Sequence, residues 1–267
     1  MLSALSVLSA LVWLLLTICA VRVLYLRQDY SLLTGGLCAV AVAFVLYLPG
    51  VNRVVDRQLA DAPLHLVNVA HLGHILLTLA AWCALGRSAL KVFKREQDIP
   101  DWLRGVLDRT RRSASAFTNT VMWWWNISNA VTAAVVLVLW FSSDLSRIPV
   151  DDMLDLHDPS SRAVAVLYSA WAFVGGILVV TGSLIGLRSV RAPRPALWVT
   201  LGIGCCGIGY AATALGLAAM GGTPLLQAHR ETVMEIWAIP GMILLSIGGT
   251  AAIVAKARGT ATSRVAD

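Results

Sequence analysis

Seven long runs of the chain contain no Asp, Glu, Lys or Arg, and this spacing of charge is the strongest constraint on its fold. About 20 apolar residues are needed for a helix to cross a bilayer. A backbone that has no water around it must satisfy its hydrogen bonds internally, as a helix does. We therefore predict an all-α polytopic membrane protein. The charge-free runs are 1–21, 30–52, 62–86, 113–143, 163–187, 195–229 and 236–255.

The composition agrees with a membrane protein, because 58% of the residues are hydrophobic and 13% are charged, against about 25% charged in soluble domains. We expect a seven-transmembrane-helix bundle over residues 1–255 and a short cytoplasmic tail over 256–267. The expected spans are 4–26, 31–49, 64–86, 119–142, 164–187, 196–219 and 236–255.

The distribution of Lys and Arg predicts the orientation. If the N-terminus lies outside, sixteen of the 21 basic residues fall in inner segments, as the positive-inside rule requires. We therefore expect the N-terminus outside, the C-terminus inside, and a location in the bacterial cytoplasmic membrane. The first span lacks the basic start of a secretory signal and is expected to be retained.

An amphipathic helix is predicted over about 99–112, in the third inner segment. Its apolar face would lie on the inner leaflet. This helix either ties two spans together or passes their movement to a cytoplasmic regulatory protein. Anionic lipid headgroups, and not nucleic acid, are the expected partner of its charges, because the basic residues flank spans. The residues expected to couple at the inner surface are Trp102, Arg104, Arg109, Arg111 and Arg112.

Three polar residues, Asn68, His71 and His74, recur every third position in the third span. This spacing puts them on one side of a helix. Polar groups at that depth need partners inside the bundle, and neutral imidazoles accept hydrogen bonds, bind metals or relay protons. The three are candidates for a ligand or proton site. The alternative is that they bond neighbouring helices and fix the packing.

The string GIGCCGIG at 202–209 contains G-x-G-x-x-G, a pattern that marks dinucleotide binding only between a strand and a helix. Here it lies inside a predicted span, so we expect close helix packing instead and no cofactor. The five cysteines all fall in spans, which gives no disulfide framework and no metal site. The predicted packing residues are Gly202, Gly204, Cys206, Gly207 and Ala211.

Trp123, Trp124 and Trp125 stand just inside the inner end of the fourth span. Indole rings favour the headgroup boundary, so all three are expected to anchor the helix there.

The segment YLPGVNRVVDRQLADAPLHLVNVAHLGHILL carries a motif of Pro49, Asp56, Pro63 and His71. It resembles the second and third helices of a family of actinobacterial multi-pass integral membrane proteins of uncharacterised function, described as transporters or integral membrane regulators. That family has Asn directly after the second proline, where this chain has Leu64. The resemblance implies a seven-helix membrane part.

These observations favour a sensory or regulatory membrane component that acts through a separate cytoplasmic partner. The alternative is a transporter of a small solute or of a proton-coupled substrate. Transport is less favoured because the chain shows no internal repeat and no charge in the middle of a span. An enzyme is not expected, because no nucleophile, base and orienting group fall at one depth.

Overall fold

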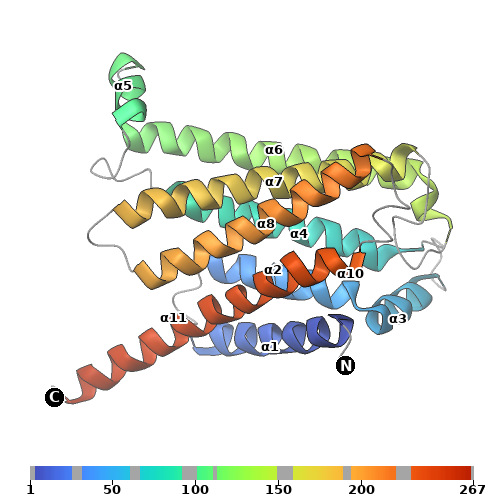
Figure 1. Cartoon of the computed structure of the whole chain (residues 1–267), viewed down its shortest axis with the longest axis horizontal. Helices are drawn as coiled ribbons and strands as arrows, with labels where there is room; N and C mark the ends of the chain where they lie inside the picture. The colour runs from blue at the N-terminus through green and yellow to red at the C-terminus, as the bar shows by residue number, and fades with distance from the viewer. Residues whose placement is uncertain are drawn as a thin grey trace.

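The computed structural model describes residues 4–25, 32–60, 67–91, 101–110, 113–148, 159–188, 194–220 and 230–265, and all regular structure in these ranges is helical. The long helices lie side by side, roughly along the long axis of the molecule (Figure 1). They are α1 (Ala4–Tyr25), α2 (Leu32–Tyr47), α4 (Val69–Leu90), α6 (Ala114–Ser142), α7 (Pro159–Arg188), α8 (Arg194–Met220) and α11 (Ile239–Val265). The short elements are α3 (Pro49–Ala60), α5 (Asp101–Thr110), η3 (Asp144–Ser146), α10 (Arg230–Val233) and the π-helical η5 (Met234–Ala238).

Five of these helices, α1, α4, α6, α7 and α8, are long and apolar enough to cross a membrane. A sixth span results if α2 and α3, which meet at 82°, count as one broken span. The apolar helix Ile236–Ala251, formed by the end of η5 and the first part of α11, is shorter than a full span. The all-α, multi-pass membrane class is therefore confirmed, with five to six spans by length and composition, against the seven predicted.

Six of the long helices form a closed ring. Around it, each helix contacts the next in the order α1, α2, α4, α7, α8 and α11, and α11 returns to α1. Helix α6 packs on the outside, against α4 and α7 (Figure 1). This arrangement encloses the side chains that the ring helices turn inward, and it places α6 at the periphery.

The chain bends sharply at Leu48, between the end of α2 at Tyr47 and the start of α3 at Pro49. A proline disfavours helical backbone in the residue before it, which accounts for the break. Helix α3 then lies near one end of the bundle (Figure 1). From there the Asp56 carboxylate accepts a hydrogen bond from the backbone N–H of Ala70, at 3.0 Å, in the first turn of α4. Asp56 thus caps α4, whose own N-cap residue, Asn68, makes no side-chain cap bond.

A buried arginine joins three helices at the opposite end of the ring. Arg22, on α1, is 3% exposed. Its guanidinium donates to the Gly249 carbonyl on α11 at 3.0 Å and to the Thr34 hydroxyl on α2 at 2.8 Å. Arg22 thus ties α1 to both of its neighbours in the ring.

Replacing Arg22 by methionine is expected to lower the stability of the bundle by about 1–3 kcal/mol, because hydrogen bonds from a charged donor are lost to two helices. Thr34→Val removes one of the two bonds and should have a smaller effect. Thermal unfolding in detergent measures both. Stability equal to or above that of the wild type would mean that the desolvation cost of the guanidinium outweighs its hydrogen bonds.

The helix predicted over about 99–112 is present as α5, which stands away from the bundle before α6 (Figure 1). Arg104 and Arg109 are exposed on it, and Leu107 packs against Ala114 and Phe117 of α6. The side chain of Trp102, and both Arg111 and Arg112, lie outside the described residues.

Trp123 and Trp124 are exposed, as interfacial anchors would be. Trp125 differs from them, because it is buried and its ring stacks on Trp171 of α7 with centroids 4.3 Å apart. Its indole N–H donates to the Cys83 carbonyl of α4 at 3.1 Å. Trp125 therefore packs α6 onto the ring, and the expectation of an anchor is wrong for this residue.

Candidate functional site: a cavity inside the helix ring

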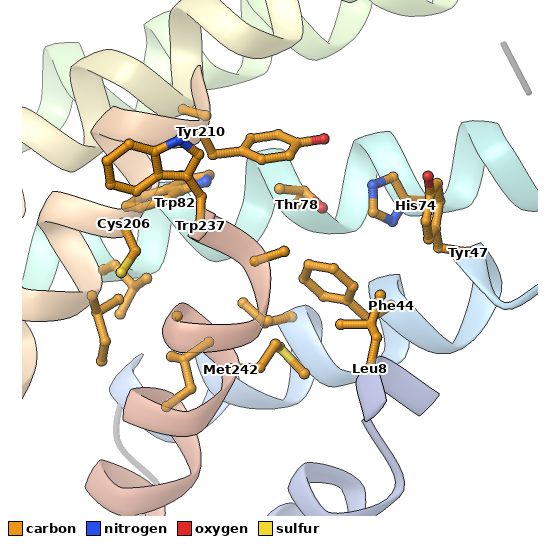
Figure 2. Close-up of a pocket in the computed structure, with 18 of the residues that line it drawn as sticks. Leu8, Phe44, Tyr47, His74, Thr78, Trp82, Cys206, Tyr210, Trp237 and Met242 are labelled. Atoms are coloured by element: carbon orange, nitrogen blue, oxygen red, sulfur yellow. The ribbon is translucent and has the colours of Figure 1, made fainter. Parts of the chain in front are cut away.

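A cavity of about 120 Å³ lies inside the ring, and each of the six ring helices, together with the π-helical η5, contributes to its wall. The peripheral α6 contributes no lining residue among those described. Figure 2 shows side chains from several helices turned toward this space. The lining residues include Phe44, Tyr47, His74, Thr78, Trp82, Tyr168, Ala172, Gly207, Tyr210, Trp237, Ala238 and Met242.

His74 holds a defined orientation in the cavity wall. Its Nδ1 lies 2.8 Å from the Ala43 carbonyl of α2, and a carbonyl can only accept, so Nδ1 carries the hydrogen. In the neutral ring Nε2 is then an acceptor, and the Tyr168 hydroxyl oxygen lies 3.4 Å from it. The ring also packs edge-on against Phe44, with centroids 5.8 Å apart. These contacts present Nε2 as the acceptor edge of His74.

Thr78 is a buried polar residue of the cavity wall. It lies four residues after His74 and therefore on the same face of α4, and it is 8% exposed. Its hydroxyl lies near the Tyr168 hydroxyl, but no described residue meets it in full hydrogen-bonding geometry. A buried hydroxyl without a partner loses free energy relative to water.

Several other hydroxyls in the described helices do have a hydrogen-bond partner. Thr118, Thr213 and Ser246 each donate to the carbonyl four residues earlier, at 2.8, 2.7 and 2.9 Å. That bond is the usual way for a helix to satisfy Ser and Thr. Thr78 does not make it, and its oxygen instead belongs to the wall of the cavity.

The three polar residues predicted on α4 separate in the structure. Of these, His74 lines the cavity. His71 is buried and meets Asn52 of α3, whose amide nitrogen is 3.2 Å from each ring nitrogen. Asn68 is buried at the start of α4, and its amide donates to the carbonyls of Leu145 and Ile148, at 2.8 and 2.7 Å. Both Asn68 and His71 thus bond the segments next to α4 instead of facing the cavity.

The motif of Pro49, Asp56, Pro63 and His71 gathers around the same end of α4. Pro49 begins α3, Asp56 caps α4, and His71 contacts Asn52 on α3. Pro63 lies outside the described residues. In this chain the described motif residues therefore connect α3 to α4.

The glycines of α8 lie where neighbouring side chains come closest. A Cβ on Gly207 would lie 2.2 Å from the Trp82 ring, and one on Gly204 would lie 2.8 Å from Val180 of α7. A Cβ on Gly202 would lie 2.7 Å from Leu244 of α11. Helix α8 therefore meets three ring helices through positions without side chains. Ala211 is fully buried, and Cys206 lines the cavity.

Trp237 and Ala238 reach the cavity from η5, which leads directly into α11. The Trp237 ring packs directly on Gly209, because a Cβ on Gly209 would lie only 2.5 Å from atoms of this ring. Short π-helical turns are frequent at functional sites, because they rotate side chains away from the regular helical register. The π turn thus adds an indole to the wall at the base of α11.

The wall carries no Asp, Glu, Lys or Arg among its described residues. No group of three His, Cys, Asp or Glu is placed to hold a metal ion in the part of the chain that the structure describes. The chemistry of the cavity therefore comes from aromatic faces, aliphatic groups, and the polar atoms of His74, Thr78 and the tyrosines.

Comparison with known proteins adds no relative: no family model, no curated protein and no solved structure matches the chain.

Thr78, Tyr168, Trp82 and Trp237 were not among the residues singled out from the sequence. Thr78 carried a usable signal, since it follows His74 by four residues and extends the same helical face by one turn. The other three come from different segments, and their convergence depends on the order of the helices around the ring.

Proposed function

We propose that this chain is a sensory or regulatory protein of the bacterial cytoplasmic membrane that binds a small ligand in the ring cavity. The observation that carries the proposal is the buried Thr78 hydroxyl, which lines the cavity and meets no described residue in full hydrogen-bonding geometry. A ligand that completes this bond removes an unfavourable term, and it contacts helices from the whole ring at once. A molecule placed there acts on the relative positions of all six helices.

The proposed topology has seven spans, with the N-terminus outside and the C-terminus inside. Two of these spans are α2 and the apolar helix Ile236–Ala251, each of which is shorter than a helix that crosses a membrane by itself. Both belong to the closed ring, which supports treating them like their neighbours. The end that carries α5 is the inner side in this proposal, in accord with the basic residues there.

The proposed output surface is α5. Helix α4 carries both cavity residues His74 and Thr78 and ends at Leu90, shortly before α5 begins at Asp101. Helix α5 projects from the bundle and exposes Arg104 and Arg109 (Figure 1). We propose that a cytoplasmic protein binds this surface and that the chain performs no catalysis itself.

A photo-crosslinking residue at Gly105 tests this role. Position 105 is on α5, and a Cβ there would meet nothing within 4 Å, so the probe disturbs no packing. Gly50 is a matched control, because its Cβ would also meet nothing within 4 Å and it lies on α3, away from α5 (Figure 1). The same probe is introduced at each position in the full chain, in its native host.

We expect a discrete crosslink to one cytoplasmic protein from position 105 and none to that protein from position 50. Equal crosslinking from both positions, or none from 105 while the probe is incorporated, contradicts the regulatory role. The second result would favour transport, which solute flux into vesicles then measures directly.

A further inference from the structure

We propose that the cavity takes a neutral molecule with one ring and one hydroxyl, a phenol, whose hydroxyl bonds both His74 and Thr78. This inference rests on the proposed function, since it names the class of ligand for the same cavity. Four features of the wall lead to it: the tautomer of His74, the unused hydroxyl of Thr78, the lack of charge, and the volume.

The part of the cavity wall formed by His74 and Thr78 fits a ligand group that both donates and accepts a hydrogen bond. Nε2 of His74 is an acceptor, because Nδ1 gives its hydrogen to Ala43 at 2.8 Å. The Tyr168 hydroxyl donates to Nε2 at 3.4 Å, which is longer than the usual length of about 2.7–3.2 Å, so a ligand hydroxyl that replaces Tyr168 at a shorter distance makes the better bond. The same ligand oxygen then accepts from the Thr78 hydroxyl.

A hydroxyl meets both demands with one oxygen, because it has one donor and two acceptor lone pairs. A ketone or an ether cannot donate to Nε2. His74 and Thr78 are four residues apart, which is about 6 Å along the axis, and an oxygen between them can reach both. The match is therefore to an alcohol or a phenol.

The remaining wall is uncharged and largely aromatic. Phe44, Trp82, Trp237 and Met242 surround the space, and Figure 2 shows the two indoles and the Phe44 ring around it. Aromatic rings pair favourably with other rings in edge and offset arrangements. A carboxylate or an ammonium would lie without a counter-charge among the described lining residues, at a high cost in free energy. The ligand is therefore neutral and carries an aromatic ring.

The volume limits the ligand to a single ring. The cavity measures about 120 Å³, close to the apolar cavity of about 150 Å³ that holds benzene in an engineered protein. A benzene ring with one hydroxyl is thus near the upper limit, and a fused ring system would need the wall to move.

Fluorine NMR with two probes of nearly equal size tests the inference. para-Fluorophenol carries the hydroxyl, and para-fluorotoluene replaces it by a methyl group. The full chain in detergent is titrated with each, and Ala172→Leu, which places a larger side chain in the wall, measures the part of the signal due to partitioning into detergent. Ala238→Leu serves as a second filled variant if the first does not fold.

We expect saturable binding of fluorophenol to the wild type, binding of fluorotoluene about tenfold weaker, and loss of both in the filled variant. Thr78→Val keeps the shape and removes the hydroxyl, so it should weaken fluorophenol by about tenfold, the equivalent of one hydrogen bond. It should leave fluorotoluene unchanged, and Thr78→Ser should restore the preference for fluorophenol.

Equal binding of the two probes, or a preference that survives Thr78→Val, would overturn the hydroxyl requirement while leaving the cavity as a binding site. Absence of saturable binding by either probe to folded protein would overturn the ligand class altogether. Neither result depends on crosslinking from Gly105, so the regulatory role stands or falls separately.

Discussion

Replacing Gly207 by alanine is expected to destabilise the bundle by about 1–3 kcal/mol, the usual range for overpacking a core. The new Cβ would lie 2.2 and 2.4 Å from two atoms of the Trp82 ring, closer than real contacts permit. Trp82 is also held from α7, where a Cβ on Gly175 would lie 3.0 Å from the same indole. The ring must therefore move, and the cavity is the open space beside it.

The same substitution should also abolish binding of fluorophenol, because a displaced Trp82 occupies the cavity. Gly216→Ala is the matched control on α8, since its Cβ would meet nothing within 4 Å. This control should be neutral or slightly stabilising, because alanine favours a helix by up to about 1 kcal/mol over glycine. Thermal unfolding and probe titration measure the pair. Equal behaviour of the two variants would show that Trp82 does not occupy the described position.

Replacing Asn68 by aspartate is expected to lower stability by about 2–4 kcal/mol. The wild-type amide donates to two carbonyls, of Leu145 and Ile148. A carboxylate cannot donate and would face both oxygens in a buried position, so two bonds are lost and a buried charge is left unpaired. The link between the start of α4 and the segment after α6 would be broken.

Asn68→Gly distinguishes the effect of losing the side-chain amide from the effect of backbone strain. Asn68 has φ of 56°, a left-handed conformation that glycine adopts readily. This variant loses the two bonds without adding strain or charge and should fall between the wild type and Asn68→Asp. Asn119→Asp, at an exposed position of α6, controls for the added charge. Stability of Asn68→Asp equal to that of this control would contradict the role of the amide as a donor.

The helical content was predictable, because charge-free runs and helix lengths depend on local sequence. The predicted span 64–86 became α4 at Val69–Leu90, and the predicted span 164–187 became α7 at Pro159–Arg188. Helix α3 was not predicted. Its charged residues Arg53, Asp56 and Arg57 removed it from the apolar pattern, although Pro49 marked where the preceding helix stops.

The site was predictable only in part. The need of His74 for partners inside the bundle followed from its position in an apolar run. Its actual partners, Ala43 and Tyr168, come from α2 and α7, and no local pattern indicates which helices are neighbours in the ring. The same holds for Arg22, whose bonds to Thr34 and Gly249 span distant segments of the chain.

The separation of Asn68 and His71 from the cavity has a similar cause. A spacing of three residues places side chains about 60° apart around a helix, so three such positions cover a wide arc. The arc of α4 faces η3 at one edge, α3 next to it, and the cavity at His74. Helical spacing alone therefore predicted one shared site for Asn68, His71 and His74, although each of them contacts a different neighbour.

The central claim is that the state of the cavity controls what α5 binds. The most direct test is the yield of the crosslink from Gly105 in two otherwise identical chains, one with Ala172→Leu in the cavity wall and one with Ala134→Leu on the exposed face of α6. Both carry the same added volume, and equal amounts of each in the membrane are verified. We predict that Ala172→Leu changes the yield severalfold and that Ala134→Leu leaves it at the wild-type value. Equal yields from the two variants would contradict the account, because the cavity would then have no influence on the inner surface.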